Sequence, residues 1–147
     1  SSNNYGPKQH EEKLIPMALN KIIKTERIPI YGDGRQKRDW IYVEDNCRGI
    51  MEVLIKGNDK EIYNIGTEKL TENIELIKIL IEKLSIKMND KQINTNLIEY
   101  IEDRLGHDRE YRLNCNKVKE NLNWKQTVDL EKGIEKTIDW YINKKGA

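Results

Sequence analysis

The sequence predicts a single small α/β domain, with the α+β character of short strands packed among helices. The chain has 147 residues, which suits one compact domain and is too few for a doubly wound catalytic domain together with a second domain. Apolar residues recur at helical spacing in several segments, and short β-prone runs lie between those segments. Isoleucine alone supplies 21 residues, so we expect enough apolar side chains to form a core.

The first half of the chain is predicted to alternate helix and strand. Pro16 is tolerable in the first turn of a helix, whereas Pro29 requires an edge strand because proline cannot donate to a ladder. The second helix has an apolar face formed by Cys47, Ile50, Met51, Leu54 and Ile55. The expected elements are a helix, a strand, a tight turn, a strand and a helix, at residues 13–24, 28–31, 32–34, 39–43 and 44–56.

The second half is predicted to contain two further strands and three helices. Trp40, Trp124 and Trp140 are expected to be core or interface anchors. The expected elements are a strand, a helix, a polar loop, a strand, a short helix and a closing helix, at residues 61–66, 73–84, 87–96, 97–101, 117–122 and 130–144.

Charge and cysteine content exclude several classes of partner. The 26 basic and 25 acidic residues give a net charge of +1, so we expect no nucleic-acid partner and no anionic-membrane partner, both of which need clustered basic residues. No apolar run approaches the length of a membrane span, and the N-terminus lacks the layout of a signal peptide, so a cytoplasmic protein is expected. Cys47 and Cys115 are expected to be buried free thiols, without a disulfide or a metal site.

One segment begins like a dinucleotide-binding fingerprint. Residues 31–37 read Tyr-Gly-Asp-Gly-Arg-Gln-Lys after a predicted strand, but the third glycine is absent. The residues that follow favour a strand and not the helix whose N-terminus would hold a pyrophosphate. A turn between two strands is therefore the preferred interpretation.

Several polar residues at strand ends and in loops have the chemistry of a nucleotide clamp. An Arg guanidinium matches phosphate oxygens, a Tyr ring can stack on a base, and Asn or His can donate to phosphate or sugar oxygens. The alternative is that Arg38 and Arg104 form only surface ion pairs with their neighbours Asp39 and Asp103. The arginines near residues 103–109 also make a cation site improbable there. The candidates are Tyr31, Arg38, Asn64, Arg104 and His107.

Six motifs in order resemble the extended short-chain dehydrogenase/reductase family of nucleotide-sugar enzymes, and within it the dTDP-sugar dehydratases. The resemblance covers almost the whole chain. It rests on Asn-Asn-Tyr-Gly-Pro, Glu-Lys-Leu-Ile-Pro, Ile-Tyr-Gly-Asp-Gly, Arg-Asp-Trp-Ile-Tyr-Val-Glu-Asp, Tyr-Asn-Ile-Gly and Gly-His-Asp-Arg, at residues 3–7, 12–16, 30–34, 38–45, 63–66 and 106–109.

This resemblance implies that residues 1–147 are the C-terminal, nucleotide-sugar-binding domain of a larger Rossmann-fold enzyme. The absence of an initiator Met and the loop-forming start also suggest a fragment. In the family, the glycine-rich NAD loop, the Tyr-x-x-x-Lys pair and the acid/base carboxylates lie in the preceding half, so we expect no catalytic residue in this chain. The parent enzyme would use NAD, which this chain alone would not bind. Its partners would be a dTDP-sugar, the NAD domain of the same polypeptide and a second subunit of a homodimer.

The resemblance also implies roles for individual residues. Tyr31 matches a residue that stacks near thymine, Arg38 and Asn64 match diphosphate positions, and Arg104 and His107 match positions around phosphate and ribose. The remaining matched positions line the nucleotide and sugar pocket, and they are Asn3, Glu12, Lys13 and Leu14.

The sequence departs from the family pattern at four positions, Lys8, His10, Glu11 and Leu105, where aromatic residues or proline are usual. These differences leave the choice between dTDP and UDP open. Two alternatives therefore stand beside the dTDP-sugar dehydratase: a fragment of a UDP-sugar epimerase or dehydratase, and a non-catalytic nucleotide-sugar-binding module.

Overall fold

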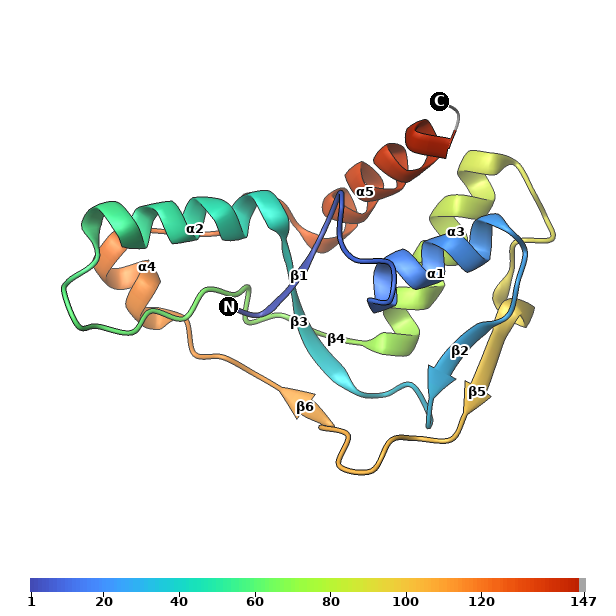
Figure 1. Ribbon diagram of the computed structural model, residues 1–147, viewed down its shortest axis with the longest axis horizontal. Coiled ribbons are helices and arrows are strands. Elements are labelled where there is room, and N and C mark those ends of the chain that lie inside the picture. Colours follow the sequence, from blue (N-terminus) through green and yellow to red (C-terminus); the bar gives the residue numbers. More distant parts are fainter. Residues whose placement is uncertain (146–147) are drawn as a thin grey trace.

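Helices gather at two ends of the molecule, and one long strand, β3, runs between them (Figure 1). The computed structural model describes residues 1–145, with side chains up to residue 143. The strands are β1 (Asn3–Tyr5), β2 (Ile28–Tyr31), β3 (Lys37–Tyr42), β4 (Leu70–Glu72), β5 (Ile98–Ile101) and β6 (Glu110–Tyr111). The helices are α1 (Leu14–Ile23), α2 (Val43–Lys56), α3 (Asn73–Met88), the 3-10 turn η1 (Thr95–Leu97), α4 (Asn116–Leu122) and α5 (Leu130–Lys145). Within the described residues, none of these helices is both long enough and apolar enough to span a membrane.

Strand β3 pairs with three other strands. Its C-terminal half is parallel to β1, with Asn3 opposite Trp40. Its N-terminal half lies between antiparallel β4 and parallel β6, so that Arg38 is opposite Thr71 on one side and Tyr111 on the other. The backbone at Arg38 is therefore held from both edges.

Successive side chains of β3 enter two separate cores, because strand residues alternate between the faces of a sheet. Trp40 and Tyr42 belong to the larger core, which is built on α1, α3 and α5. Ile41 belongs to the smaller core, together with Cys115 and Trp124. Asp39 lies on the same face of β3 as Ile41 and is likewise buried. One six-residue strand thus links both ends of the molecule.

Strands β2 and β5 form a separate two-stranded parallel sheet (Figure 1). Pro29 fits there because each strand of such a sheet has a free edge, as the sequence predicts. The predicted turn at residues 32–34 follows β2, and Gly34 in it has φ +73°. A Cβ at Gly34 would lie 2.8 Å from Ile30 Cγ2, so only glycine fits this position without a shift.

Most predicted elements are present, and the differences concern short strands. Residues 61–66 are not a strand, and β1, β4 and β6 were not predicted. The residues just after 61–66 hydrogen-bond to a side chain and not to a ladder. The backbone N–H groups of Thr67 and Glu68 donate to the carboxylate of Asp39, at 2.9 and 3.0 Å. This buried carboxylate therefore holds the backbone that directly follows the segment.

The apolar face of helix α2, which the sequence pattern would place in a core, is exposed to solvent. Leu54 and Ile55 are 75% and 68% exposed, and Ile50 and Met51 are each 51% exposed. The prediction that Cys47 is buried is also wrong, whereas Cys115 is buried as predicted. The physical reason is that α2 approaches the small core through Gly49, where a Cβ would lie 2.9 Å from Ile65 Cγ2.

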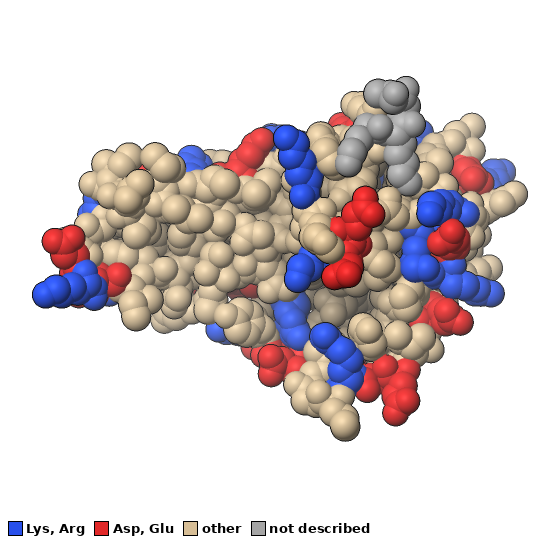
Figure 2. All heavy atoms as spheres, viewed as in Figure 1, with Lys and Arg blue, Asp and Glu red and all other residues tan. Residues whose placement is uncertain are grey.

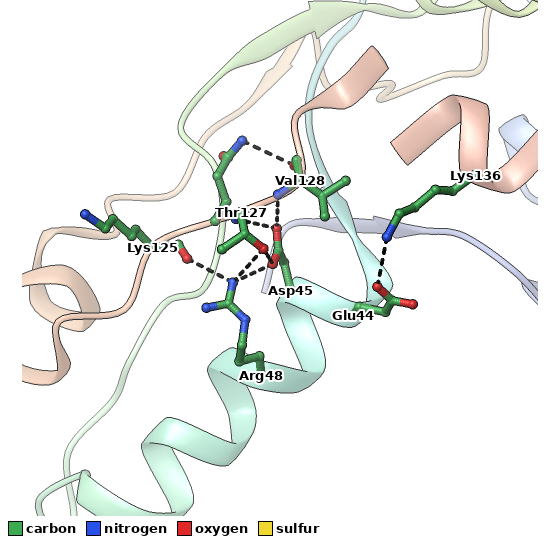
Figure 3. A network of polar contacts seen from close by, with 8 residues as sticks. Glu44, Asp45, Arg48, Lys125, Thr127, Val128 and Lys136 are labelled. Atoms are coloured by element: carbon green, nitrogen blue, oxygen red, sulfur yellow. Dashed lines mark hydrogen bonds and ion pairs between the residues drawn. The ribbon is translucent and has the colours of Figure 1, made fainter. Parts of the chain in front are cut away.

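The N-terminal end of α2 is fastened by Asp45, whose side chain is buried (Figure 3). Asp45 accepts hydrogen bonds from the backbone N–H groups of Thr127 and Val128, both at 2.8 Å. It also accepts from the Thr127 hydroxyl at 2.7 Å and pairs with Arg48. Burial raises the pKa of Asp45, but these hydrogen bonds outweigh burial and leave the pKa below its ordinary value.

We predict that Asp45→Ala lowers the free energy of unfolding by about 2–4 kcal/mol, because two backbone N–H groups lose a charged acceptor. Glu44→Ala is the matched control, since Glu44 is exposed and only pairs with Lys136 at 3.4 Å; it should cost at most about 1 kcal/mol. Urea denaturation of the three proteins measures both effects. Equal losses in the two variants would contradict this account of Asp45.

The Asp45 contribution should also depend on pH. Because its pKa is lower in the folded chain, the stabilisation is present above the unfolded-state pKa of about 3.9 and is lost as the pH falls through the folded-state value. The difference in stability between wild type and Asp45→Ala should therefore shrink on acidification below about pH 4.

Candidate functional site

The turn after β2 and the loop after β5 are held against each other. The two strands are parallel and in register, with Tyr31 opposite Ile101, so their following segments leave the sheet at the same end. The backbone N–H of Gly32 donates to the carbonyl of Ile101 at 2.9 Å. Further along the loop, Arg109 donates two hydrogen bonds to Asp33, at 2.8 and 2.7 Å. These bonds also hold the pKa of Asp33 well below its usual range.

Three of the predicted site residues meet on this turn and loop. Tyr31 is 41% exposed, and the Arg104 guanidinium lies 5.1 Å from the centre of its ring. The His107 ring meets the Tyr31 ring edge-on, with centroids 6.1 Å apart and an interplanar angle of 86°. A cation, an imidazole and a phenol ring are thus gathered at one surface, which we call the Tyr31 cluster (Tyr31, Arg104 and His107).

Arg38 is bound to the same loop. Its Nη2 donates to the carbonyl of Asp108 at 2.8 Å, and its Nη1 donates to the carbonyl of Lys37 at 2.8 Å. The backbone N–H of Lys37 also donates to the carbonyl of Arg109, at 2.8 Å. Arg38 therefore does not form the alternative surface ion pair with Asp39, whose carboxylate binds Thr67 and Glu68, and it lies beside the loop that carries Arg104 and His107.

Two residues that sequence reasoning missed support the cluster from below. Asp103 contacts His107, with its Oδ1 2.6 Å from Nδ1 of the imidazole. Gln36 is 1% exposed, and its Nε2 donates to Asp103 Oδ2 at 2.9 Å and to the Tyr31 carbonyl at 3.1 Å. A long polar side chain in a turn gives no sequence signal that it is buried, so Gln36 could not be recognised in advance, and the contact between Asp103 and Gln36 joins segments far apart in the sequence.

Asn64 lies apart from the Tyr31 cluster. Its Nδ2 donates to the carbonyl of Asn114 at 3.1 Å, which ties it to the segment before α4. Glu68, in the same loop as Asn64, accepts from the backbone N–H of Cys115 at 2.8 Å. Asp39 holds this loop from the β3 side, as described above. The position of Asn64 therefore depends on β3, the strand that also carries Arg38.

The other four predicted residues lie near the N-terminus. Asn3 is in β1 opposite Trp40, and Leu14 begins α1 and packs against the larger core. Glu12 and Lys13 directly precede that helix. Within the described residues, no hydrogen bond, ion pair or ring contact joins any of these four side chains to the Tyr31 cluster.

The turn at residues 32–34 does not fit a dinucleotide. It connects β2 to β3, so no helix N-terminus follows to receive a pyrophosphate. Gly32 instead packs against Asp103, since a Cβ there would lie 2.8 Å from Asp103 Oδ2. The turn therefore joins two strands, as the sequence predicts, and lacks the following helix of a dinucleotide fingerprint.

The surface beside the turn is an open hollow and not a closed pocket. It is lined by Gly32, Asp33, Arg35, Glu72 and Tyr100 among others. A second hollow lies between β4, α3 and α5, where Lys78 and Lys132 alternate with acidic residues. No predicted site residue lines either hollow. We place the candidate site at the Tyr31 cluster because three of the predicted site residues meet there.

The class of protein follows from comparison with known families. Residues 1–137 match a family model described as GDP-mannose 4,6 dehydratase. The chain therefore belongs to this dehydratase family, and the resemblance expected from its motifs is confirmed.

Its relatives narrow the assignment. The dTDP-glucose 4,6-dehydratase of Escherichia coli is 43% identical over 148 residues, which cover 98% of this chain and 41% of the relative. The structure of dTDP-glucose 4,6-dehydratase from Streptomyces venezuelae, with NAD bound, has a TM-score of 0.90 and 36% identity, covering 99% of this chain and 43% of that one. UDP-glucose 4-epimerase from Thermotoga maritima, with UDP-glucose, has a TM-score of 0.85 and 32% identity, covering 97% and 44%. The chain thus spans about two fifths of the length of the relatives it matches.

Proposed function

We propose that this chain is the substrate-binding part of a dTDP-glucose 4,6-dehydratase, and that residues 1–147 act as one nucleotide-sugar-binding domain. The complete enzyme would convert dTDP-glucose to dTDP-4-keto-6-deoxyglucose with bound NAD. The observation that carries the proposal is the meeting of Tyr31, Arg104 and His107 at one surface, with Arg38 bonded to the same loop. Identity to the dTDP-glucose dehydratases over nearly the whole chain supports it.

The chemistry of the cluster suits a nucleoside diphosphate. An exposed Tyr31 ring can stack on the base, and such stacking contributes roughly 1–3 kcal/mol. Arg38 and Arg104 would hold the diphosphate from β3 and from the loop, and each charge-assisted hydrogen bond contributes roughly 1.5–3 kcal/mol. His107 would contact the ribose.

The remaining residues would line the pocket towards the sugar. Asn64 has an amide that can reach phosphate oxygens from the loop beside α4. Asn3, Glu12, Lys13 and Leu14 would meet the hexose from β1 and the start of α1. These groups lie outside the Tyr31 cluster, so the ligand itself, or the rest of the enzyme, would connect them.

A UDP-sugar ligand is the second candidate. The Thermotoga maritima epimerase, whose structure contains UDP-glucose, shares the fold of this chain and is 32% identical to it over the matched part. The departures at Lys8, His10, Glu11 and Leu105 fall in loops near the candidate pocket, and Leu105 beside Arg104 is fully exposed. A non-catalytic binding module would share the clamp but never join a catalytic partner.

The exposed apolar stripe of α2, formed by Ile50, Met51, Leu54 and Ile55, is proposed as the contact with the NAD-binding part of the enzyme. The relatives are more than twice as long as this chain, and the Streptomyces venezuelae structure holds NAD. The end of the molecule that contains α2 also shows few charged side chains on the face seen in Figure 2. An exposed apolar surface of this kind usually marks a contact with a partner. The parent is proposed to be a cytoplasmic homodimer, and the free thiols Cys47 and Cys115 agree with a reducing compartment.

We predict that the chain binds dTDP and that Arg38→Ala and Arg104→Ala each weaken binding about tenfold or more, because each removes charge-assisted bonds to phosphate. Calorimetric titration with dTDP, UDP and dTDP-glucose measures this. Arg27→Ala is the control, since it removes the same charge before the opposite end of β2. Unchanged affinity in both site variants would refute the clamp, and a preference for UDP would favour the epimerase-like relative.

We predict that the isolated chain self-associates weakly through the α2 stripe, because its proposed partner is absent. Leu54→Glu should abolish the association seen by light scattering at high concentration. The matched control is Ile86→Glu in α3, because Ile86 is 74% exposed against 75% for Leu54. A wild-type chain that stays monomeric, or equal effects of the two substitutions, would contradict the role given to this stripe.

The chain alone is predicted to have no dehydratase activity, because the oxidation step requires a hydride acceptor that its residues do not bind. Incubation of the pure chain with dTDP-glucose and NAD, followed by product analysis, tests this. Formation of the 4-keto-6-deoxy sugar at a rate above the buffer control would overturn it.

A further inference from the structure

Asp103 makes three contacts beneath the Tyr31 cluster. Its Oδ1 accepts from the backbone N–H of Arg104 at 2.9 Å and lies 2.6 Å from His107 Nδ1. Its Oδ2 accepts from Gln36 Nε2 at 2.9 Å. The carboxylate therefore joins the turn after β2 to the loop after β5, and it contacts the backbone of Arg104.

Asp103 accepts hydrogen bonds on both carboxylate oxygens, from Gln36 and from the backbone N–H of Arg104, and these bonds favour its ionised form. The Gln36 amide is buried, and its nitrogen faces two acceptors, Asp103 Oδ2 and the Tyr31 carbonyl at 3.1 Å. The opposite amide orientation would put an oxygen against both acceptors, so nitrogen is the only group that fits there. The hydrogen bonds from His107, Arg104 and Gln36 also lower the pKa of Asp103.

An ionised carboxylate has no proton to donate, so the proton in the 2.6 Å contact must belong to Nδ1 of His107. A neutral imidazole carries one proton, which leaves Nε2 as an acceptor. Within the described part of the chain, no group hydrogen-bonds to Nε2. The His107 side chain is only 7% exposed and its ring meets Tyr31 edge-on, so the ring is also sterically held.

We infer that Asp103 is a positioning residue that fixes the Nδ1–H tautomer of His107, so that His107 Nε2 accepts a hydrogen bond from a hydroxyl of the bound nucleotide. This inference rests on the proposed function and adds to it a specificity for the ligand hydroxyl. An acceptor nitrogen repels phosphate oxygens, whereas Arg38 and Arg104 carry donors only. The arginines would thus bind the diphosphate, and His107 would bind a sugar hydroxyl.

The first test is the tautomer of ligand-free His107, read from long-range 1H–15N NMR spectra at about pH 8, where an unperturbed imidazole is neutral. The chain has only two histidines, so the spectrum is simple to assign. Wild type should show the Nδ1–H form, and Asp103→Ala should gain the Nε2–H form. Glu102→Ala is the matched control, since it removes the same charge one residue earlier, and it should leave the tautomer unchanged.

The second test compares the affinity of the chain for dTDP and for 3′-deoxythymidine diphosphate, which lacks the sugar hydroxyl. Wild type and Glu102→Ala should prefer dTDP about three- to tenfold, the range of one neutral hydrogen bond. Asp103→Ala should reduce that preference to less than about twofold. If Asp103 had a merely structural role, Asp103→Ala would weaken the binding of both ligands equally and leave the ratio of their affinities unchanged.

Each outcome bears on a separate statement. An Nε2–H tautomer in the wild-type chain overturns the inference whatever the chain binds, and equal affinities of wild type for the two nucleotides overturn it as well. If the chain shows the Nδ1–H tautomer but does not bind dTDP, the proposed function and the hydroxyl specificity are contradicted. The action of Asp103 on His107 is then still supported. If Asp103→Ala does not fold, the His107 tautomer of the wild-type chain and its ratio of affinities for the two nucleotides still test the inference.

Discussion

The alternation of side chains along β3 holds the two ends of the molecule together. Trp40 and Tyr42 enter the larger core while Ile41 enters the smaller one, so neither core can shift without moving this strand. Asp39, on the same face of β3 as Ile41, binds the backbone of the loop that carries Asn64. Arg38 stands at the start of the same strand, held by β4 and β6 and bonded to the loop of Arg104 and His107. The candidate binding groups are therefore positioned by backbone pairing, before any ligand arrives.

Local patterns predicted the longer elements well, because apolar spacing alone decides where a helix or buried strand begins. Helices α1, α3, α4 and α5 and strand β2 lie close to their expected bounds. Short strands were less predictable, since β1 and β6 exist only because β3 lies beside them. Residues 61–66 have strand-like composition, yet the Asp39 carboxylate binds the backbone that follows them. Such a competition between a ladder and a distant side chain leaves no mark on the local sequence.

Helix α2 shows a second limit of sequence reasoning. Its apolar periodicity correctly predicts a helix, but the face that covers the small core is the one with Asp45 and Gly49, and the apolar face is exposed. The apolar stripe is the surface for which we propose a contact with the NAD-binding part of the enzyme. The sequence also showed only part of the site. The chemistry of Tyr31, Arg38, Arg104 and His107 was recognisable, whereas the roles of Asp103 and Gln36 depend on the burial of Gln36 and on the contacts between distant segments.

The central claim is that the chain carries a preformed clamp for a nucleoside diphosphate at the Tyr31 cluster. A crystal structure of the chain with dTDP tests it most directly. We expect the base against Tyr31 and the diphosphate between Arg38 and Arg104. Occupation of the hollow between α3 and α5, near Lys78 and Lys132, with the Tyr31 cluster empty would contradict the account.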